Sequence, residues 1–140
     1  MKPKAAVAID MANLIRYISP MKRIVAAFYA NASGRQPVRD WLIAMSSADR
    51  KIVGKDIATV EFGWPVGMPV CRALGSDLRE IRSTIRGGKV EVRTYFAIDG
   101  GTMLLLHAQE GKSGQADAIK LALHRLRDHR NRQGKDIERG

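Results

Sequence analysis

Most of the side chains that could carry out chemistry lie in one stretch, at positions 77–108, and they are arginines and a histidine. Arginine binds phosphate through two parallel hydrogen bonds. Cationic donors aimed at charge that develops on a phosphate also lower the barrier to its reaction. The stretch contains Arg79, Arg82 and Arg93, and it ends beside His107. Because the pKa of a histidine lies near neutrality, His107 could act as an acid or a base.

The same stretch predicts three consecutive antiparallel strands, at 78–84, 90–98 and 102–107. Glycine-containing turns separate them, and such turns supply the positive φ that tight hairpins need. Successive side chains of a strand point to opposite faces of its sheet. Arg79 and Arg82 therefore fall on opposite faces, so only one of them can belong to a given face of the sheet. We expect a curved sheet with arginines gathered on one face.

Two helices are expected before these strands. A strand at 23–30 would be the first of the sheet, and a helix then begins at Pro37, since proline is tolerated in a first turn. A second helix begins where Ser46 and Asp49 match a capping box, and it ends at Gly63. Together the two helices would form a hairpin packed against the sheet.

The remaining segments complete an α+β fold. Residues 64–75 contain several prolines and glycines and read as a loop that leads into the sheet. Residues 116–130 predict a helix with an apolar stripe at helical spacing: Ile119, Ala122, Leu123 and Leu126. The expected architecture is an antiparallel curved sheet packed against an N-terminal helical hairpin and a C-terminal helix.

The chain divides into one domain and two flanking segments. The domain spans 21–130, and 131–140 is a charged tail that we expect to be flexible. Residues 1–20 precede a second natural start at Met21. They are either a native extension or an artefact of start-site choice or cloning, and both interpretations stay open.

Length and composition limit the classes of protein. A chain of 140 residues fits one domain, and no apolar run reaches the roughly 18 residues of a membrane span. The formal charge of +10 indicates a polyanion or an acidic protein as the partner. A single cysteine, Cys71, cannot pair within the chain, so a reducing, cytoplasmic location is expected. The composition provides no metal or disulfide framework, and we expect no cofactor.

Several short motifs follow one another in an order and spacing that are fairly specific. Their residues are Leu74, Leu78, Glu80, Ile81 and Arg82, then Val92, Arg93, Tyr95 and Phe96, then the run 103–107, then Lys112 ahead of a helix with Ala118 and Ala122. This pattern resembles the RelE/ParE superfamily of type II toxin–antitoxin toxins, and within it the phage-derived HigB-like branch. The segment that begins at Pro37 also suits that branch, so the resemblance covers about 23–130.

The resemblance implies a RelE-like fold and a toxin that cleaves mRNA on the ribosome and so inhibits translation. Such an endoribonuclease activates a 2′-hydroxyl to attack the adjacent phosphate, which needs no metal. The implied partners are a cognate antitoxin of the helix-turn-helix type, the ribosome and mRNA, with no membrane. Two alternatives stay open: a ParE-like inhibitor of DNA gyrase, and a catalytically silent domain that binds its antitoxin or nucleic acid.

The resemblance, for Arg82, Arg93 and Lys112, and the chemistry of the side chains, for the others, together indicate the site residues. The catalytic candidates are Arg82, Arg93, Lys112 and His107. The candidates for RNA binding are Arg79, Arg86, Lys89 and Tyr95, of which the tyrosine could stack on a base. The closing helix has no tyrosine, which some members of the superfamily place near the C-terminus as a catalytic residue.

Overall fold

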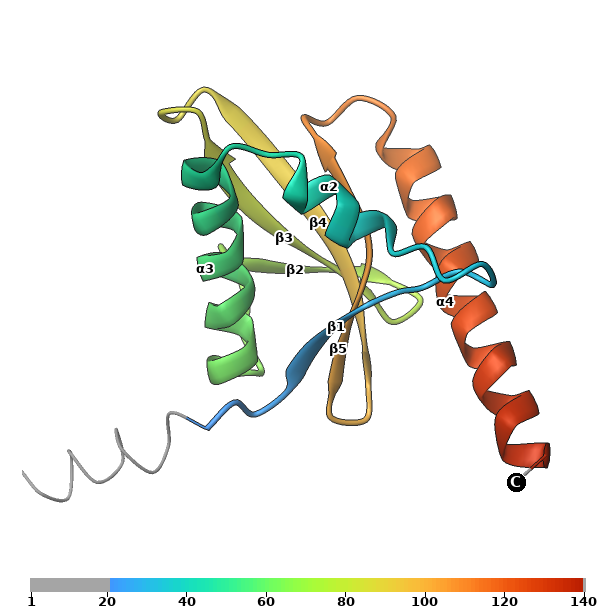
Figure 1. Ribbon diagram of the computed structural model, residues 1–140. Helices are drawn as coiled ribbons and strands as arrows, with labels where there is room; N and C mark the ends of the chain where they lie inside the picture. Colours follow the sequence, from blue (N-terminus) through green and yellow to red (C-terminus); the bar gives the residue numbers. More distant parts are fainter. Residues whose placement is uncertain (1–20, 140) are drawn as a thin grey trace, which may run out of the picture.

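The computed structural model describes residues 21–139, and the surroundings of side chains as far as residue 134. The predicted extension at 1–20 lies outside the described residues. In chain order the elements are β1 (Val25–Phe28), α2 (Pro37–Ile43), α3 (Ser47–Gly63), β2 (Cys71–Gly75), β3 (Leu78–Ile85), β4 (Val90–Asp99), β5 (Thr102–Glu110) and α4 (Gln115–Arg139). They form an α+β fold with one five-stranded sheet and helices on both of its faces (Figure 1).

The sheet is open and mixed, with the strand order β1-β5-β4-β3-β2. Strands β2 to β5 form the antiparallel part, whereas β1 pairs with β5 in parallel. The prediction of an antiparallel sheet is therefore wrong for β1. Strands joined by a tight turn must run antiparallel, but β1 is separated from β5 by the rest of the domain and is free to pair in either direction.

A second correction concerns β2, which lies inside the segment 64–75 that the sequence predicted to be a loop. Of its five residues only Cys71 is buried, so the strand shows no alternation of apolar and polar side chains. It follows a run with two prolines and lies at the edge of the sheet, next to β3. Its pairing with β3 makes it a strand, and local pattern does not reveal such pairing.

Two apolar layers hold the helices to the sheet. On one face α2 and α3 pack through Val38, Leu42, Val53, Ile57 and Val60 against a set that includes Ile81, Ile85, Val92, Phe96, Met103 and Leu105. On the other face α4 packs through Ala118, Ala122 and Leu126 against a set that includes Tyr29, Leu78, Tyr95, Leu104 and Leu106. The predicted stripe of the closing helix thus faces the sheet. We call this second side the α4 face.

The ends of the helices follow local signals. The Ser46 hydroxyl oxygen accepts a hydrogen bond of 3.2 Å from the backbone N–H of Asp49, which confirms the predicted N-cap of α3. Helix α2 begins at Pro37 and α3 ends at Gly63, as predicted. Helix α4 continues to Arg139, past the predicted end at 130, so most of the predicted tail is helical.

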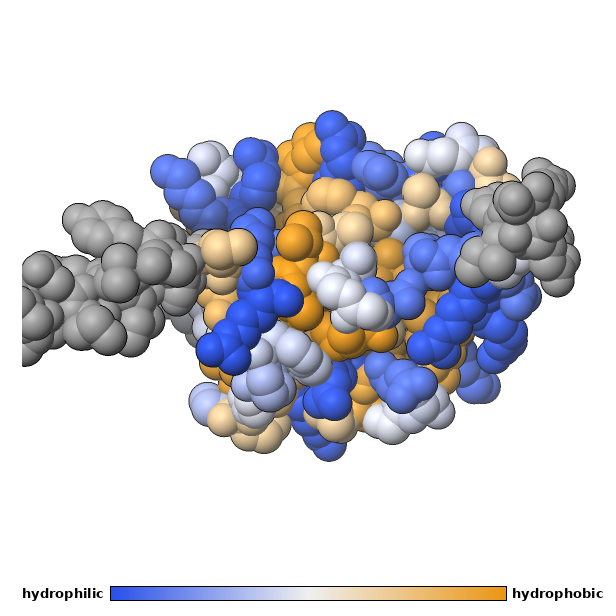
Figure 2. Space-filling model, turned by 90° about the horizontal axis from the view of Figure 1, so that it is seen from below, coloured by the Kyte–Doolittle hydropathy of each residue, from blue (hydrophilic) through white to orange (hydrophobic). Residues whose placement is uncertain are grey.

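The surface combines apolar and hydrophilic areas. Figure 2 shows the underside of the molecule, where apolar residues form an area near the middle that hydrophilic residues border. No helix within the described part of the chain is both long enough and apolar enough to cross a membrane.

Candidate functional site

Arg82 and Arg93 lie directly opposite each other on β3 and β4. Residues paired in this way across an antiparallel ladder point to the same face of the sheet. That face is the α4 face, because Leu78 and Tyr95, which share the alternation of the two arginines, pack in the α4 layer. The sheet therefore brings together the two arginines that the sequence singled out.

Arg72 extends this pair to a third strand. It lies on β2 opposite Glu80, and Glu80 in turn lies opposite Tyr95. Arg72 therefore belongs to the α4 face too, and it is exposed. No pattern in the sequence pointed to Arg72, because residues 64–75 were predicted to be a loop.

A buried carboxylate holds the arginines in place. Glu80 has no exposed surface. Its Oε1 atom accepts a hydrogen bond of 3.1 Å from Nε of Arg82, and its Oε2 atom accepts one of 3.1 Å from Nε2 of Gln115, the first residue of α4. Nε of Arg93 lies 3.9 Å from Oε2. The sequence suggested Glu80 only as part of a motif, although its spacing of two from Arg82 already put both side chains on one face.

The two arginines differ in what they can offer a ligand. The side chain of Arg82 is 30% exposed and uses its Nε atom on Glu80, so its terminal nitrogens remain available to a phosphate. The side chain of Arg93 is only 4% exposed, and its Nη1 atom donates a 2.8 Å hydrogen bond to Glu91. We conclude that Arg82 is placed to contact a ligand, whereas Arg93 contributes positive charge from within the sheet.

Tyr95 and His107 form the next row of the same face. They pair across β4 and β5, and their rings stack at 6.0 Å between centroids. The Tyr95 hydroxyl is buried and has no hydrogen-bond partner within the described residues. Burial raises the pKa of Tyr95, and the nearby charge of Glu80 raises it further, so the phenol stays protonated at neutral pH.

His107 is held in its neutral form. Burial lowers the pKa of the imidazole, and the positive charge of Arg125 lowers it further. Arg125 donates a 2.8 Å hydrogen bond to the carbonyl oxygen of Leu106, and its Nη1 atom lies 3.5 Å from Nδ1 of His107. His107 lines a hollow of about 220 Å³ together with Trp41 of α2 and Arg125 of α4. A neutral imidazole beside a hollow can accept a proton.

The other predicted residues lie away from this face or at its margin. Lys112 is exposed in the turn between β5 and α4, and the preceding residue, Gly111, donates to the carbonyl oxygen of Glu91 at 2.7 Å. Lys89 is exposed where the β3–β4 turn ends. Arg86, in that turn, is 2.6 Å from Glu110, so a carboxylate already engages its guanidinium.

Arg79 lies on the opposite face from Arg82, as the alternation predicted. Its guanidinium sits 5.0 Å from the centroid of the Trp64 ring. Among the residues that the structure describes, no three His, Cys, Asp or Glu side chains are grouped so that they could hold a metal ion.

Comparison with models of protein families, with curated proteins and with solved structures finds no match to this chain. The resemblance to the RelE/ParE superfamily rests on the sequence motifs and stays a prediction.

Proposed function

We propose that the chain is a RelE/ParE-like toxin of the HigB-like branch, an endoribonuclease that cleaves mRNA on the ribosome. The observation that carries the proposal is the pairing of Arg82 with Arg93 on one sheet face, with the buried Glu80 between them. In the proposed RelE-like fold, α2 and α3 are the N-terminal helical hairpin and α4 is the closing helix.

The proposed reaction is an attack within the RNA chain. The 2′-oxygen forms a bond to the adjacent phosphorus, the bond to the 5′-oxygen breaks, and a 2′,3′-cyclic phosphate remains. Arg82 binds the phosphate oxygens as charge develops on them, and Lys112 adds a second cation from the turn. Neutral His107 accepts the proton of the 2′-hydroxyl, and the departing 5′-oxygen takes up a proton from solvent water.

The partners follow from charge. A formal charge of +10 favours ribosomal RNA and messenger RNA, whose phosphates attract cations over long range. We propose that an acidic segment of a helix-turn-helix antitoxin covers the cationic α4 face. Such complementarity acts mainly on the rate and the specificity of association, so added salt should slow formation of the complex.

A second candidate function is a catalytically silent domain that binds RNA or its antitoxin. The observation that favours it is the burial of Arg93, whose Nη1 atom is already bonded to Glu91 at 2.8 Å. Because only 4% of its side chain is exposed, an arginine held in this way has little surface to offer a substrate.

The test is cleavage of a reporter mRNA on ribosomes by the full chain, with Arg82→Ala, Arg82→Lys and a matched control. The control is Arg39→Ala, which removes an exposed arginine of α2 on the other face. Loss of one donor to a developing oxyanion costs on the order of 100-fold or more in rate, so Arg82→Ala should lose at least that much. Arg82→Lys should recover part of the rate, because lysine keeps the charge but not the two-point geometry.

Two further readouts decide between the candidates. The product should carry a 2′,3′-cyclic phosphate, and a message with a 2′-deoxy sugar at the cut site should resist. Efficient cleavage of the deoxy message would contradict the mechanism. RNA binding without cleavage by the wild-type chain would favour the silent domain, and inhibition of gyrase supercoiling by the same preparation would favour a ParE-like activity.

A further inference from the structure

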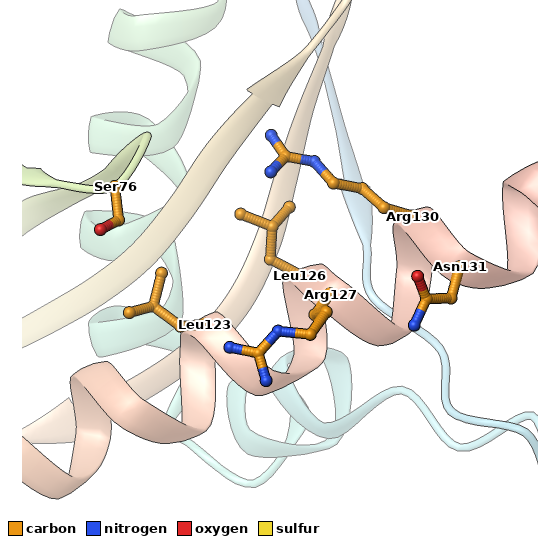
Figure 3. Close-up of a pocket in the computed structure, with 6 residues that line it drawn as sticks. All are labelled: Ser76, Leu123, Leu126, Arg127, Arg130 and Asn131. Carbon is orange, nitrogen blue, oxygen red and sulfur yellow. The ribbon is translucent and has the colours of Figure 1, made fainter.

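A hollow between α4 and the β2–β3 turn contains arginines that the proposed reaction does not use. It has a volume of about 310 Å³, and its lining residues are Ser76, Leu123, Leu126, Arg127, Arg130 and Asn131. Figure 3 shows the guanidinium groups of Arg127 and Arg130 extending from α4 toward the side on which Ser76 lies. The two arginines are three positions apart on a helix, so they are neighbours on one helix face.

Arg130 also lines a second hollow, of about 230 Å³, together with Trp64, Asp77, Arg79 and Ile98. The two hollows therefore share one arginine. Together the two hollows are lined by three arginines, Arg79, Arg127 and Arg130, and by one carboxylate, that of Asp77. Their lining therefore carries a net positive charge. Arg79 stands over the Trp64 ring at 5.0 Å, and this guanidinium plane is a surface on which a base can stack.

We infer that these two hollows bind the backbone of single-stranded RNA through Arg127 and Arg130, with Arg79 as a stacking surface. The inference rests on the RNA-binding part of the proposed function but not on cleavage. Arginine suits phosphate because its fork of donors matches two phosphate oxygens. The Ser76 hydroxyl and the Asn131 amide add neutral donors at the same hollow.

The lining favours RNA over an acidic protein. A tight protein interface needs a central apolar or aromatic anchor that fills a pocket. At the first hollow Leu126 is only 2% exposed, and the one partly exposed apolar residue in the lining is Leu123, an aliphatic side chain between two arginines and two neutral polar residues. Arginines combined with a stacking surface are instead the combination that binds single strands without strong sequence preference.

Asp77 provides a variant that should strengthen RNA binding, whereas the arginine variants should weaken it. Its Oδ2 atom lies 3.6 Å from Nη2 of Arg130, and the two side chains are 74% and 47% exposed. An exposed pair of this kind contributes little to stability, so a phosphate can displace the carboxylate. Asp77 has a φ of 67°, a left-handed conformation that asparagine tolerates as aspartate does. Asp77→Asn therefore removes the competing charge without straining the turn.

The experiment measures binding of a short unstructured RNA oligonucleotide to the full chain at several salt concentrations. Arg127→Ala and Arg130→Ala should each weaken binding about threefold to fivefold. Each should also reduce the steepness of the salt dependence by about 0.7. Asp77→Asn should tighten binding, and Arg39→Ala on the other face should change it less than either α4 variant. Thermal unfolding of every variant checks that the fold is intact.

The outcomes separate this inference from the proposed function. Unchanged RNA binding in the folded double variant Arg127→Ala/Arg130→Ala would overturn the inference, whatever happens to cleavage. Loss of binding to a polyglutamate peptide with unchanged RNA binding would overturn it in favour of an acidic protein. Weakened RNA binding in the two variants supports it even if the wild-type chain cleaves no message.

Discussion

The carboxylate of Glu80 is the buried negative charge of the candidate site. It is fully buried, and it meets Arg82, Arg93 and Gln115 from two strands and one helix. Removing one partner of a buried charge pair leaves the other charge without compensation, which costs far more than the loss of an exposed pair. Glu80 therefore positions the arginines and also joins the start of α4 to the sheet.

We expect Glu80→Gln to lower the free energy of unfolding by about 3 kcal/mol, because Arg82 and Arg93 lose the charge between them. Urea denaturation measures this difference. Glu91→Gln is the matched control, since Glu91 also bonds to Arg93 but its side chain is 43% exposed. That variant should cost less than about 1 kcal/mol. Equal losses in the two variants would mean that Glu80 has no special role.

The lowered pKa of His107 leads us to expect that the stability of the fold depends on pH. Because burial and Arg125 lower its pKa in the folded chain, the unfolded chain binds a proton at this residue first as the pH falls. Stability should therefore decrease as the pH falls below the ordinary histidine pKa of about 6.5, and the loss should level off below the folded pKa. His107→Gln should remove this part of the loss, as measured by chemical denaturation across the window.

The exposed His124 of α4 provides the control for that experiment. His124→Gln should leave the acid dependence of the wild type in place. If His107→Gln leaves the profile unchanged as well, the imidazole is not held neutral by its surroundings.

At the scale of elements, the sequence predicts what local pattern determines. The strands β3, β4 and β5, the N-cap at Ser46 and the apolar stripe of α4 all depend on neighbours within a few residues, and all were predicted. Strand β2 and the parallel pairing of β1 depend on partners far along the chain, and the sequence missed both.

The same limit applies to the candidate site. Alternation predicted that Arg79 and Arg82 occupy opposite faces. It could not predict that Arg82 lies directly opposite Arg93, because that register is set by the β3–β4 turn, where Arg86 adopts a φ of 52° and Gly87 one of 65°. Arg72 was not predicted either, because its place in the site depends on the pairing of β2 with β3. Burial of Glu80 also depends on α4, whose first residue closes over it.

At the scale of the whole molecule, hydrogen bonds near the start of the described chain indicate where the folding unit begins. The residues just before and within β1 bond to Glu61, near the end of α3. The backbone N–H groups of Arg23 and Ile24 donate to the carbonyl oxygen of Glu61, at 2.8 and 3.2 Å. The carboxylate of Glu61 accepts from Lys22 at 3.0 Å and from the backbone N–H of Ala26 at 2.7 Å. These contacts anchor β1 to the end of α3 from residue 22 onward.

We therefore expect a chain that starts at Met21 to fold and to keep the activity of the full chain. Both apolar layers contain described residues from Ile24 onward that the shortened chain keeps, and the contacts of Lys22 and Arg23 with Glu61 are retained. Thermal unfolding should give the same midpoint within a few degrees, because a difference of 1 kcal/mol shifts the midpoint of a domain of this size by about 4 °C.

The control is a second variant that starts at Ala26. It lacks the contacts of Lys22 and Arg23 with Glu61 and should melt well below both the full chain and the chain from Met21. An insoluble or much less stable chain from Met21 would show that residues 1–20 belong to the fold.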